Sequence, residues 1–317
     1  LSLRAPLQFV SAPLFLALVT GDFDIERRVY CRIVLLGNHM KGAALDTPHI
    51  AFVGAGNMAS SIIGGLIASG HSAGYITAAD PFPASLERLR ESAPVAVYND
   101  NAEAARSADI VILAVKPQIM AEATDSIAAV VRANNAVVIS IAAGVTIASM
   151  QARLGPEAAI VRCMPNTPAL LQHGASGLFG NDNCSAQQRD FAQRVLSAVG
   201  ITCWVDSEQE LDAITALSGS GPAYFFLFIE AMIDAGKALG LDADIATKLA
   251  LQTSLGASQM ALQSDVDLAE LRRRVTSPGG TTECAVQSFE QSGLRKIVAT
   301  AMHAAADRAA EMAREMG

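Results

Sequence analysis

The chain has 317 residues, of which 51% are hydrophobic and only 17% are charged, and its formal net charge is −8. This length favours about two domains, and the negative charge argues against nucleic-acid partners and against basic membrane-surface proteins. The apolar surplus favours burial between subunits. Five scattered cysteines without a C-x-x-C pair predict a reduced, cytoplasmic protein without structural zinc.

Residues 1–46 differ from the rest and are predicted to be an N-terminal extension. Their apolar run "APLQFVSAPLFLALVTG" is interrupted by prolines and is shorter than the about 20 residues that span a bilayer. Asp22 and Asp24 follow it where a signal peptide would carry small residues at its cleavage site. We therefore expect residues 1–39 to be upstream sequence, with Met40 as the natural start, and no membrane partner.

A strand, a glycine turn and a helix begin near Thr47. "HIAFVG" is typical of a buried strand, and "GAGNMASSIIGGLIASG" follows with helical spacing and Gly70 at its expected end. In the G-x-G-x-x-A turn, Gly54 permits the tight bend and Gly56 lets the backbone approach a pyrophosphate. Ala59 keeps the helix close to the sheet. We predict dinucleotide binding; the alternative is a tight turn without a ligand.

The second predicted strand, "YITAAD", ends at Asp80. An acid there typically hydrogen-bonds the adenosine ribose and favours NAD. Pro81 could instead turn the carboxylate away and make Asp80 a simple turn residue, while Arg88 and Arg90 could pair with a ribose phosphate. The sequence alone leaves NAD and NADP open.

Further strands are expected in "DIVILAVKP" (109–117), "NAVVISIAAGV" (135–145), "AAIVRCMPNTPAL" (158–170) and "ITCWVD" (201–206). Pro117 ends the first at the sheet edge where ligands bind. Lys116 there is either a cation beside the cofactor or a solvated lysine. Ala142, Ala143 and Gly144 are small enough for a nicotinamide ring to lie against the backbone.

After Asp206 the pattern changes to long, Ala-rich helices. We predict an α/β Rossmann-type dinucleotide-binding domain over residues 47–207 and an all-helical dimerisation domain over 208–317; a monomeric bundle is the alternative. "SPGGTT" interrupts the helices with poor helix formers. Its backbone N–H groups could bind an anion at a helix start, or Ser277 could cap that helix with Pro278 at its first position.

From about His49 onward, the chain resembles the pyrroline-5-carboxylate reductases. The motifs that carry the resemblance are "FVGAGNMA", "AVKPQ", "SIAAGVTI", "MPNTPA", "ALSGSGPAYFFLFIEAM" and "VTSPGGTTECAV", in the family's order. The resemblance implies reduction of 1-pyrroline-5-carboxylate to L-proline, usually with NADPH and in some members with NADH. It implies a homodimer, often assembled into rings such as a decamer. Asp80 departs from the Ser or Arg type common in NADPH-preferring members, and residues 1–46 have no counterpart.

The same resemblance assigns residues to the site. Ser277, Gly279, Gly280 and Thr281 are expected to hold the substrate carboxylate. Thr282 is expected to place its hydroxyl near the ring nitrogen as the catalytic group. Asn166 is expected to orient the nicotinamide or the substrate, with an Asx turn before Pro168 as the alternative. Cofactor contacts are expected from Gly54, Gly56, Asn57, Met58, Ala59, Asp80, Asn101, Ala114, Lys116, Pro117 and Ala142.

No metal is predicted, because the five histidines lack ligand spacing and an imine can arrive already protonated. We expect His173 to be a loop residue. Ser218 and Ser220 are expected to cap helices, with Gly219 and Gly221 allowing close packing near the pocket.

Two other functions compete with the reductase. A 3-hydroxyacid dehydrogenase-like oxidoreductase needs a lysine base with an asparagine one helical turn onward. The helix after "SGSG" begins "PAYFFLF", without a lysine, and Lys237 is followed at those positions by Gly240 and Leu241. A non-catalytic dinucleotide-binding protein would keep "GAGNMA" but would not need "SPGGTT". Oxidation of a reduced cofactor on adding the cyclic imine separates these functions.

Overall fold

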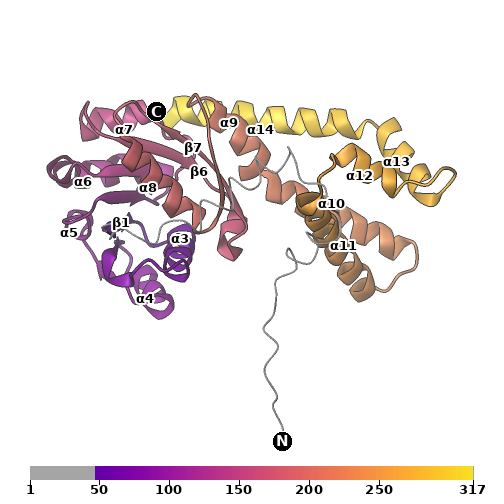
Figure 1. Cartoon of the computed structure of the whole chain (residues 1–317), viewed down its shortest axis with the longest axis horizontal. Coiled ribbons are helices and arrows are strands. Elements are labelled where there is room, and N and C mark those ends of the chain that lie inside the picture. The colour runs from indigo at the N-terminus through magenta and orange to yellow at the C-terminus, as the bar shows by residue number, and fades with distance from the viewer. Residues whose placement is uncertain (1–46, 317) are drawn as a thin grey trace, which may run out of the picture. The chain divides into compact units, whose positions relative to one another are not determined.

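The computed structural model describes residues 47–316; the predicted extension, residues 1–46, and residue 317 lie outside the described residues. An α/β domain is followed by helices, as predicted (Figure 1). The last strand ends at Trp204 and the next helix begins at Glu210. Contacts keep Thr47–Gly317 together as one unit, so the boundary between residues 207 and 208 stays a prediction.

The first domain is built on an eight-stranded sheet in the order β3-β2-β1-β4-β5-β6-β7-β8, and only the β6–β7 pair is antiparallel. Every strand expected from the sequence is present. Two strands, β3 and β7, were not predicted: β3 is three residues long, and β7 reads GASGLFG, with little β propensity. The strands are β1 (Ile50–Val53), β2 (Ile76–Ala79), β3 (Ala96–Tyr98), β4 (Ile110–Leu113), β5 (Val137–Ser140), β6 (Ile160–Met164), β7 (Gly174–Gly180) and β8 (Gly200–Trp204).

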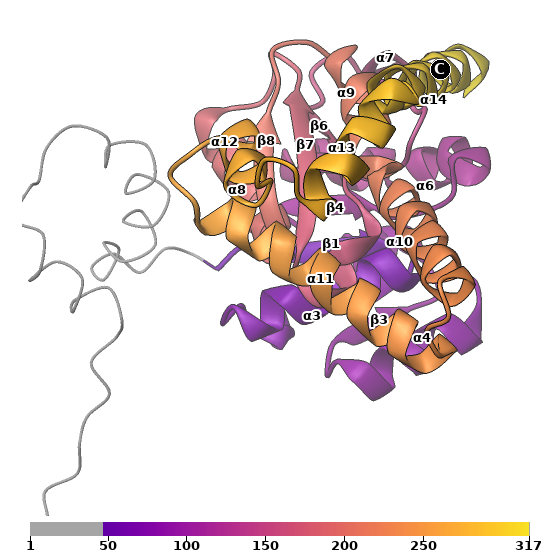
Figure 2. The ribbon, with the colours of Figure 1, turned by 90° about the vertical axis from the view of Figure 1, so that its right-hand side faces the viewer.

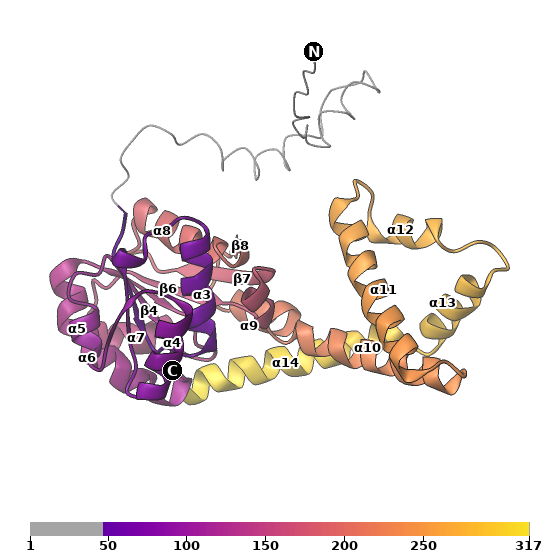
Figure 3. The same cartoon turned by 90° about the horizontal axis from the view of Figure 1, so that it is seen from below.

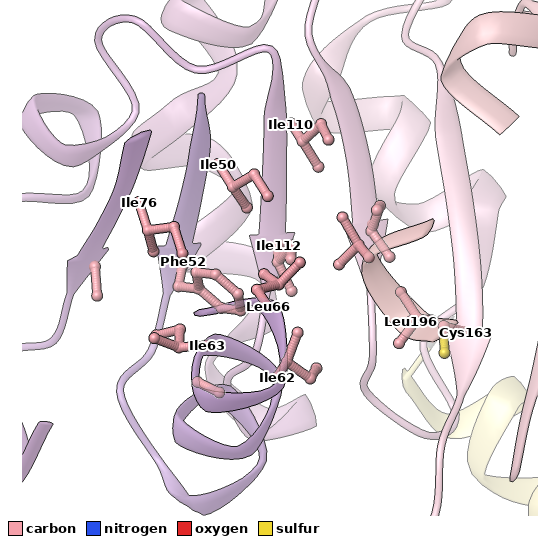
Figure 4. Packing of buried hydrophobic residues seen from close by; sticks show 14 of the residues in the cluster. Ile50, Phe52, Ile62, Ile63, Leu66, Ile76, Ile110, Ile112, Cys163 and Leu196 are labelled. Carbon is pink, nitrogen blue, oxygen red and sulfur yellow. The ribbon is translucent and has the colours of Figure 1, made fainter. Parts of the chain in front are cut away.

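Helices cover both faces of this sheet, which explains why β1, β4 and β5 are buried along their whole length. Phe52 packs with Ile62, Ile63 and Leu66 of α3 in one apolar cluster (Figure 4). α4 and α8 contribute to the same cluster, whereas α6 and α7 contribute to a second one. The helices of this domain are α3 (Asn57–Ala68), α4 (Pro83–Ser92), α5 (Asn101–Ala104), α6 (Met120–Asn134), α7 (Ile147–Leu154) and α8 (Ala186–Ser197), with short 3-10 turns η1 (Ala73–Tyr75), η2 (Pro117–Ile119) and η3 (Thr167–Leu171).

The end of α3 confirms the expected glycine stop. Gly70 has a φ of +97°, its N–H donates to the Ile67 carbonyl over 3.0 Å, and the His71 N–H donates to the Leu66 carbonyl over 2.9 Å. These two bonds are those of a Schellman motif.

The rest of the chain is helical (Figure 2). A single long helix, Glu210–Ala238, contains a π-helical segment, and by length and composition alone it could cross a membrane. No residue of α12 or α13 is buried, and Gly221 is the one buried residue of α10. These helices therefore lack a core of their own within one chain. They are α9 (Glu210–Ile214), the π segment η4 (Thr215–Gly219), α10 (Gly221–Ala238), α11 (Ala243–Gln263), α12 (Leu268–Arg274), α13 (Thr281–Gln291) and α14 (Leu294–Met316).

Two adjacent glycines test the packing of α3. A Cβ on Gly64 would meet nothing within 4 Å, so Gly64→Ala should raise the free energy of unfolding by up to about 1 kcal/mol through helix propensity. A Cβ on Gly65 would lie 2.6 Å from the Ala198 carbonyl oxygen, so Gly65→Ala should lower the free energy of unfolding by about 1–3 kcal/mol. Denaturant unfolding measures both. Equal stability of the two variants would contradict this packing.

Candidate functional site

The glycine turn lies where the strand order reverses, between β1 and β4, and cofactors bind at such a point in open α/β sheets. Gly54 has a φ of +100°, and a Cβ there would lie 2.6 Å from the Ala114 carbonyl oxygen, so only glycine fits. A Cβ on Gly56 would meet nothing within 4 Å. The protein itself therefore does not require glycine at position 56, whereas close approach of a ligand would.

The helix that follows the turn has the small buried residue that the motif needs. Ala59 is 1% exposed and belongs to the apolar cluster that joins α3 to the sheet. Asn57 is exposed, Met58 is half-buried, and the backbone N–H groups of both have no acceptor among residues 47–316. The start of α3 thus presents free amides and the positive end of the helix dipole.

Asp80 follows β2 and is 8% exposed. One of its carboxylate oxygens accepts from the Ala55 N–H over 2.8 Å and the other from the Phe82 N–H over 2.9 Å. The carboxylate therefore faces the glycine turn and its own loop. Arg88 and Arg90 lie exposed on α4, and the guanidinium of Arg88 bonds to the Ala84 carbonyl and the Ser85 hydroxyl.

The other predicted cofactor residues follow strand ends at the same edge of the sheet. Ala114 comes directly after β4, and its N–H donates to the Val53 carbonyl over 2.8 Å. Lys116 is exposed and precedes the 3-10 turn that Pro117 begins. Ala142 is 8% exposed after β5. Asn101 begins α5 after β3 and donates from its side chain to the Ser126 hydroxyl over 3.0 Å.

Asn166 connects the sheet to the π segment. Its side-chain N–H donates to the Ser218 carbonyl over 3.1 Å, and its side-chain oxygen accepts from the Ala175 N–H over 2.9 Å. The Asx-turn alternative is therefore wrong, because the side chain bonds to distant segments. An open pocket of about 360 Å³ lies here, lined by Asn166, Pro168, Leu217, Ser218, Gly221, Pro222, Phe225 and Phe226.

The expectation that Ser218 caps a helix is wrong, and Ser220 occupies the N-cap position of α10 but makes no capping hydrogen bond with its side chain. The helix continues through them as a π turn, in which the Ser220 N–H donates to the Thr215 carbonyl over 2.8 Å. Such a turn often marks a functional site. A Cβ on Gly219 would lie 2.6 Å from Met164, so this glycine permits the expected close packing, whereas Gly221 has nothing within 4 Å.

The "SPGGTT" turn precedes α13, which begins at Thr281 with Gly280 as its N-cap residue. Ser277 is not the N-cap, so that alternative is wrong: Gly280 is the N-cap residue and has the extended backbone that a helix start requires. Gly279 has a φ of +70°, and its N–H donates to the Glu283 carboxylate over 2.7 Å. The Gly280 N–H donates to the Ser277 carbonyl over 3.0 Å.

The side-chain and backbone donors that remain free at this turn are on Ser277 and the two threonines. Within residues 47–316, neither the backbone N–H groups nor the hydroxyls of Thr281 and Thr282 have a partner, and the Ser277 hydroxyl also has none. Three consecutive arginines end α12 directly before the turn. Hydrogen bonds from two of them, Arg273 and Arg274, lower the pKa of Glu270 to about 2. These arginines are already paired, Arg273 and Arg274 with Glu270 and Arg272 with Glu290. The features of the turn that favour an anion are therefore the free amides at the start of α13.

Within one chain the two halves of the predicted site are separate. No hydrogen bond or ion pair in the described part joins residues 277–282 to the strand ends that carry the cofactor residues. α12 and α13 lie apart from the sheet (Figure 3).

A buried ion pair beside the strand ends was not predicted. Arg162 of β6 donates to Glu208 over 2.6 Å, and their side chains are 8% and 22% exposed. An arginine inside the apolar strand "IVRCM" was the available signal, because buried arginines are almost always paired.

His173 lies exposed in the loop before β7, and residues 47–316 contain no cluster of metal-ligating side chains. Burial raises the pKa of the Cys163 thiol to about 12 and also raises that of Cys184, which makes both poor nucleophiles.

Comparison with known proteins extends these observations. A family model described as pyrroline-5-carboxylate reductase dimerisation matches residues 208–312, and one described as NADP oxidoreductase coenzyme F420-dependent matches residues 49–144. A pyrroline-5-carboxylate reductase of Pseudomonas aeruginosa is 52% identical over 273 residues, which cover 86% of this chain and 100% of that protein.

Two solved structures agree with this match. A pyrroline-5-carboxylate reductase from Coxiella burnetii superposes with a TM-score of 0.82 at 41% identity, covering 84% of this chain and 99% of that one. The Plasmodium falciparum pyrroline carboxylate reductase with NADP bound gives a TM-score of 0.74 at 30% identity, covering 84% and 98%. With its glycine turn, its π segment and its "SPGGTT" turn, this chain belongs to the pyrroline-5-carboxylate reductase family.

Proposed function

We propose that the chain reduces 1-pyrroline-5-carboxylate to L-proline by hydride transfer from NAD(P)H, the last step of proline biosynthesis. Membership of the family supports this activity. The observation that carries it is the presence, in one chain, of two helix starts with free backbone amides. One lies at the strand-order reversal and suits a pyrophosphate, and the other lies at the "SPGGTT" turn and suits a carboxylate.

The residues at the first helix start fit a dinucleotide. Gly56 has open space beside it, and the amides of Asn57 and Met58 are free to bind phosphate oxygens. The remainder of the cofactor would lie against residues that follow three strands: Ala114, Lys116 and Pro117 after β4, Asn101 after β3, and Ala142 after β5. When bound, a reduced nicotinamide supplies the hydride that the imine carbon receives.

The second helix start would hold the substrate. Its carboxylate would bind at Ser277, Gly279, Gly280 and Thr281, where the Thr281 amide and two hydroxyls are unengaged and the α13 dipole is favourable. Gly279 already donates to Glu283, so its amide becomes available only if that carboxylate moves. The Thr282 hydroxyl would donate a hydrogen bond at the ring nitrogen, which gains a proton as the carbon is reduced.

A second copy would complete the site. The helices after residue 208 expose large apolar side chains, among them Phe225, Phe226 and Leu227 at 65%, 67% and 67% exposure. We infer that two copies pair through these helices and that the "SPGGTT" turn of one copy faces the strand ends of the other, since one chain keeps the two apart. The match to a dimerisation model supports the homodimer. Assembly into a decamer stays an expectation.

NADPH is proposed as the usual reductant, with NADH also accepted. The description of the family model and the NADP-bound relative support it. The Asp80 carboxylate binds protein amides, and the exposed Arg88 and Arg90 could bind a ribose phosphate.

The reaction itself gives the first test. Adding the cyclic imine to the purified full chain should oxidise NADPH, and NADH at a lower kcat/KM, whereas a 3-hydroxyacid with oxidised cofactor should give no reaction. The loss of reduced-nicotinamide absorbance measures both. Turnover of the hydroxyacid alone would replace the proposed function by the dehydrogenase alternative.

Gly56→Val tests the pyrophosphate contact. The side chain would enter open space, so the fold should persist, but the valine should block the phosphates and raise the cofactor Kd at least about tenfold. Cofactor titration measures this, and Gly64→Ala on the same helix serves as the control. An unchanged Kd in a folded Gly56→Val protein would refute the assignment.

Thr282→Ala tests proton assistance. Loss of the hydroxyl should lower kcat by roughly ten- to a hundredfold, near the low end for general acid catalysis. Thr282→Ser keeps the hydroxyl and should retain most of the activity. Steady-state kinetics of the two folded variants measure kcat. Full activity in Thr282→Ala would remove this residue from the mechanism.

A further inference from the structure

The loop between β5 and α7, residues 141–146, lies at the carboxyl edge of the sheet beside β4. Its small residues Ala142, Ala143 and Gly144 are those expected against the nicotinamide ring. Gly144 has a φ of +76°, a conformation that favours glycine. The placement of this loop would therefore set the placement of the reactive end of the cofactor.

The last turns of α14 lie directly against this loop. A Cβ on Gly144 would be 3.0 Å from Met312 Cβ and 3.4 Å from the Met312 carbonyl carbon. Ala309, one turn earlier, is 8% exposed and is the one buried residue of the 23-residue helix. The C-terminal end of α14 is thus docked on its own chain.

The other end of the loop is held from the segment before α9. Glu208 accepts from the Ile147 N–H over 2.8 Å with the same oxygen that accepts from Arg162 over 2.6 Å. Ile147 is the first residue of α7, so this bond fixes the point where the loop enters the helix.

Asp212 of α9 lies near this ion pair, and Arg314 of α14 lies near Asp212. Burial raises the pKa of the Asp212 carboxyl, with nearby Glu208 adding to the rise, while Arg162 and Arg314 lower it. Arg314 comes from α14, two residues after Met312. The elements at the beginning and end of the helical region, α9 and α14, contact each other, and α9 also contacts β6.

We propose that the C-terminal end of α14 and Glu208 are positioning elements for the nicotinamide-facing loop, so that the helical region sets the geometry of hydride transfer. This rests on the proposed function. The contacts are made to residues 144 and 147, whereas the phosphate-binding amides lie on α3 after β1. Loosening the loop should therefore slow the hydride step without weakening the hold on the nucleotide phosphates.

Gly144→Ala tests the contact with α14. The new methyl would push the loop and the helix apart, and because small misplacements cost up to about a hundredfold in rate, we expect kcat to fall roughly tenfold. The deuterium isotope effect with NADPH labelled at the transferred position should rise, because hydride transfer becomes more limiting. The Kd of 2′-phospho-ADP-ribose, which lacks nicotinamide, should stay unchanged.

Two further variants separate contact from backbone strain. Gly155→Ala places alanine at a φ of +109°, but its Cβ would lie no closer than 3.7 Å to another residue, so kcat and the isotope effect should stay near those of the unaltered chain. Met312→Gly in the Gly144→Ala background removes the opposing Cβ and should restore part of kcat and lower the isotope effect again.

Substitutions of Glu208 test the same inference independently of Gly144. Glu208→Ala leaves the Ile147 N–H without an acceptor and should raise the isotope effect as Gly144→Ala does, whereas Glu208→Gln keeps an oxygen there and should retain most of kcat. If Gly144→Ala fails to fold, the two Glu208 variants test the inference in its place. The inference is overturned if Gly144→Ala keeps full kcat, if Met312→Gly restores nothing, or if Glu208→Ala leaves the isotope effect unchanged. An unaltered chain that does not oxidise NADPH with the imine would instead refute the proposed function.

Discussion

The close approach of the glycine turn to the end of β4 is the constraint on which the proposed nucleotide site depends. Gly54 lies so near the Ala114 carbonyl that any side chain would overlap it. From the other side, Asp80 of the β2 end holds the same turn through the Ala55 amide. The turn is therefore fixed by both strands that flank β1, and the start of α3 is aimed before a cofactor binds.

The helical region obeys a different constraint, since it cannot bury its apolar faces within one chain. Phe225 and Phe226 are two-thirds exposed and also line the pocket beside Asn166. The "SPGGTT" turn belongs to this same region, between two helices with no buried residue. The proposed substrate binding is thus linked physically to assembly: the surface that needs a partner also carries the turn proposed to bind the substrate carboxylate.

Local features could be predicted from the sequence, and features set by distant contacts could not. The glycine turn and the stop at Gly70 depend on a few neighbouring residues, which the sequence displays directly. β7 was missed because its glycine-rich sequence becomes a strand only by pairing with β6 and β8. The cap expected at Ser218 was wrong because a π turn continues the helix, and Asn166, 52 residues earlier, binds its carbonyl. The free donors at the second turn were also not predicted, although their competitors are close in sequence, because the motif does not specify that Glu283 binds the Gly279 amide or that Gly280 is the N-cap.

The junction between the α/β domain and the helices combines two kinds of contact with different consequences. Met312 against Gly144 is apolar and close, so it limits distance but carries little directional information. Glu208 binds Arg162 and the Ile147 amide through one oxygen, and such bonds have preferred directions. Burying these charges is costly unless both partners remain paired. A rotation of α9 that broke either bond would leave a buried polar group unpaired. The polar contacts therefore define how the helices are oriented on the α/β domain, which the apolar contact alone would leave free.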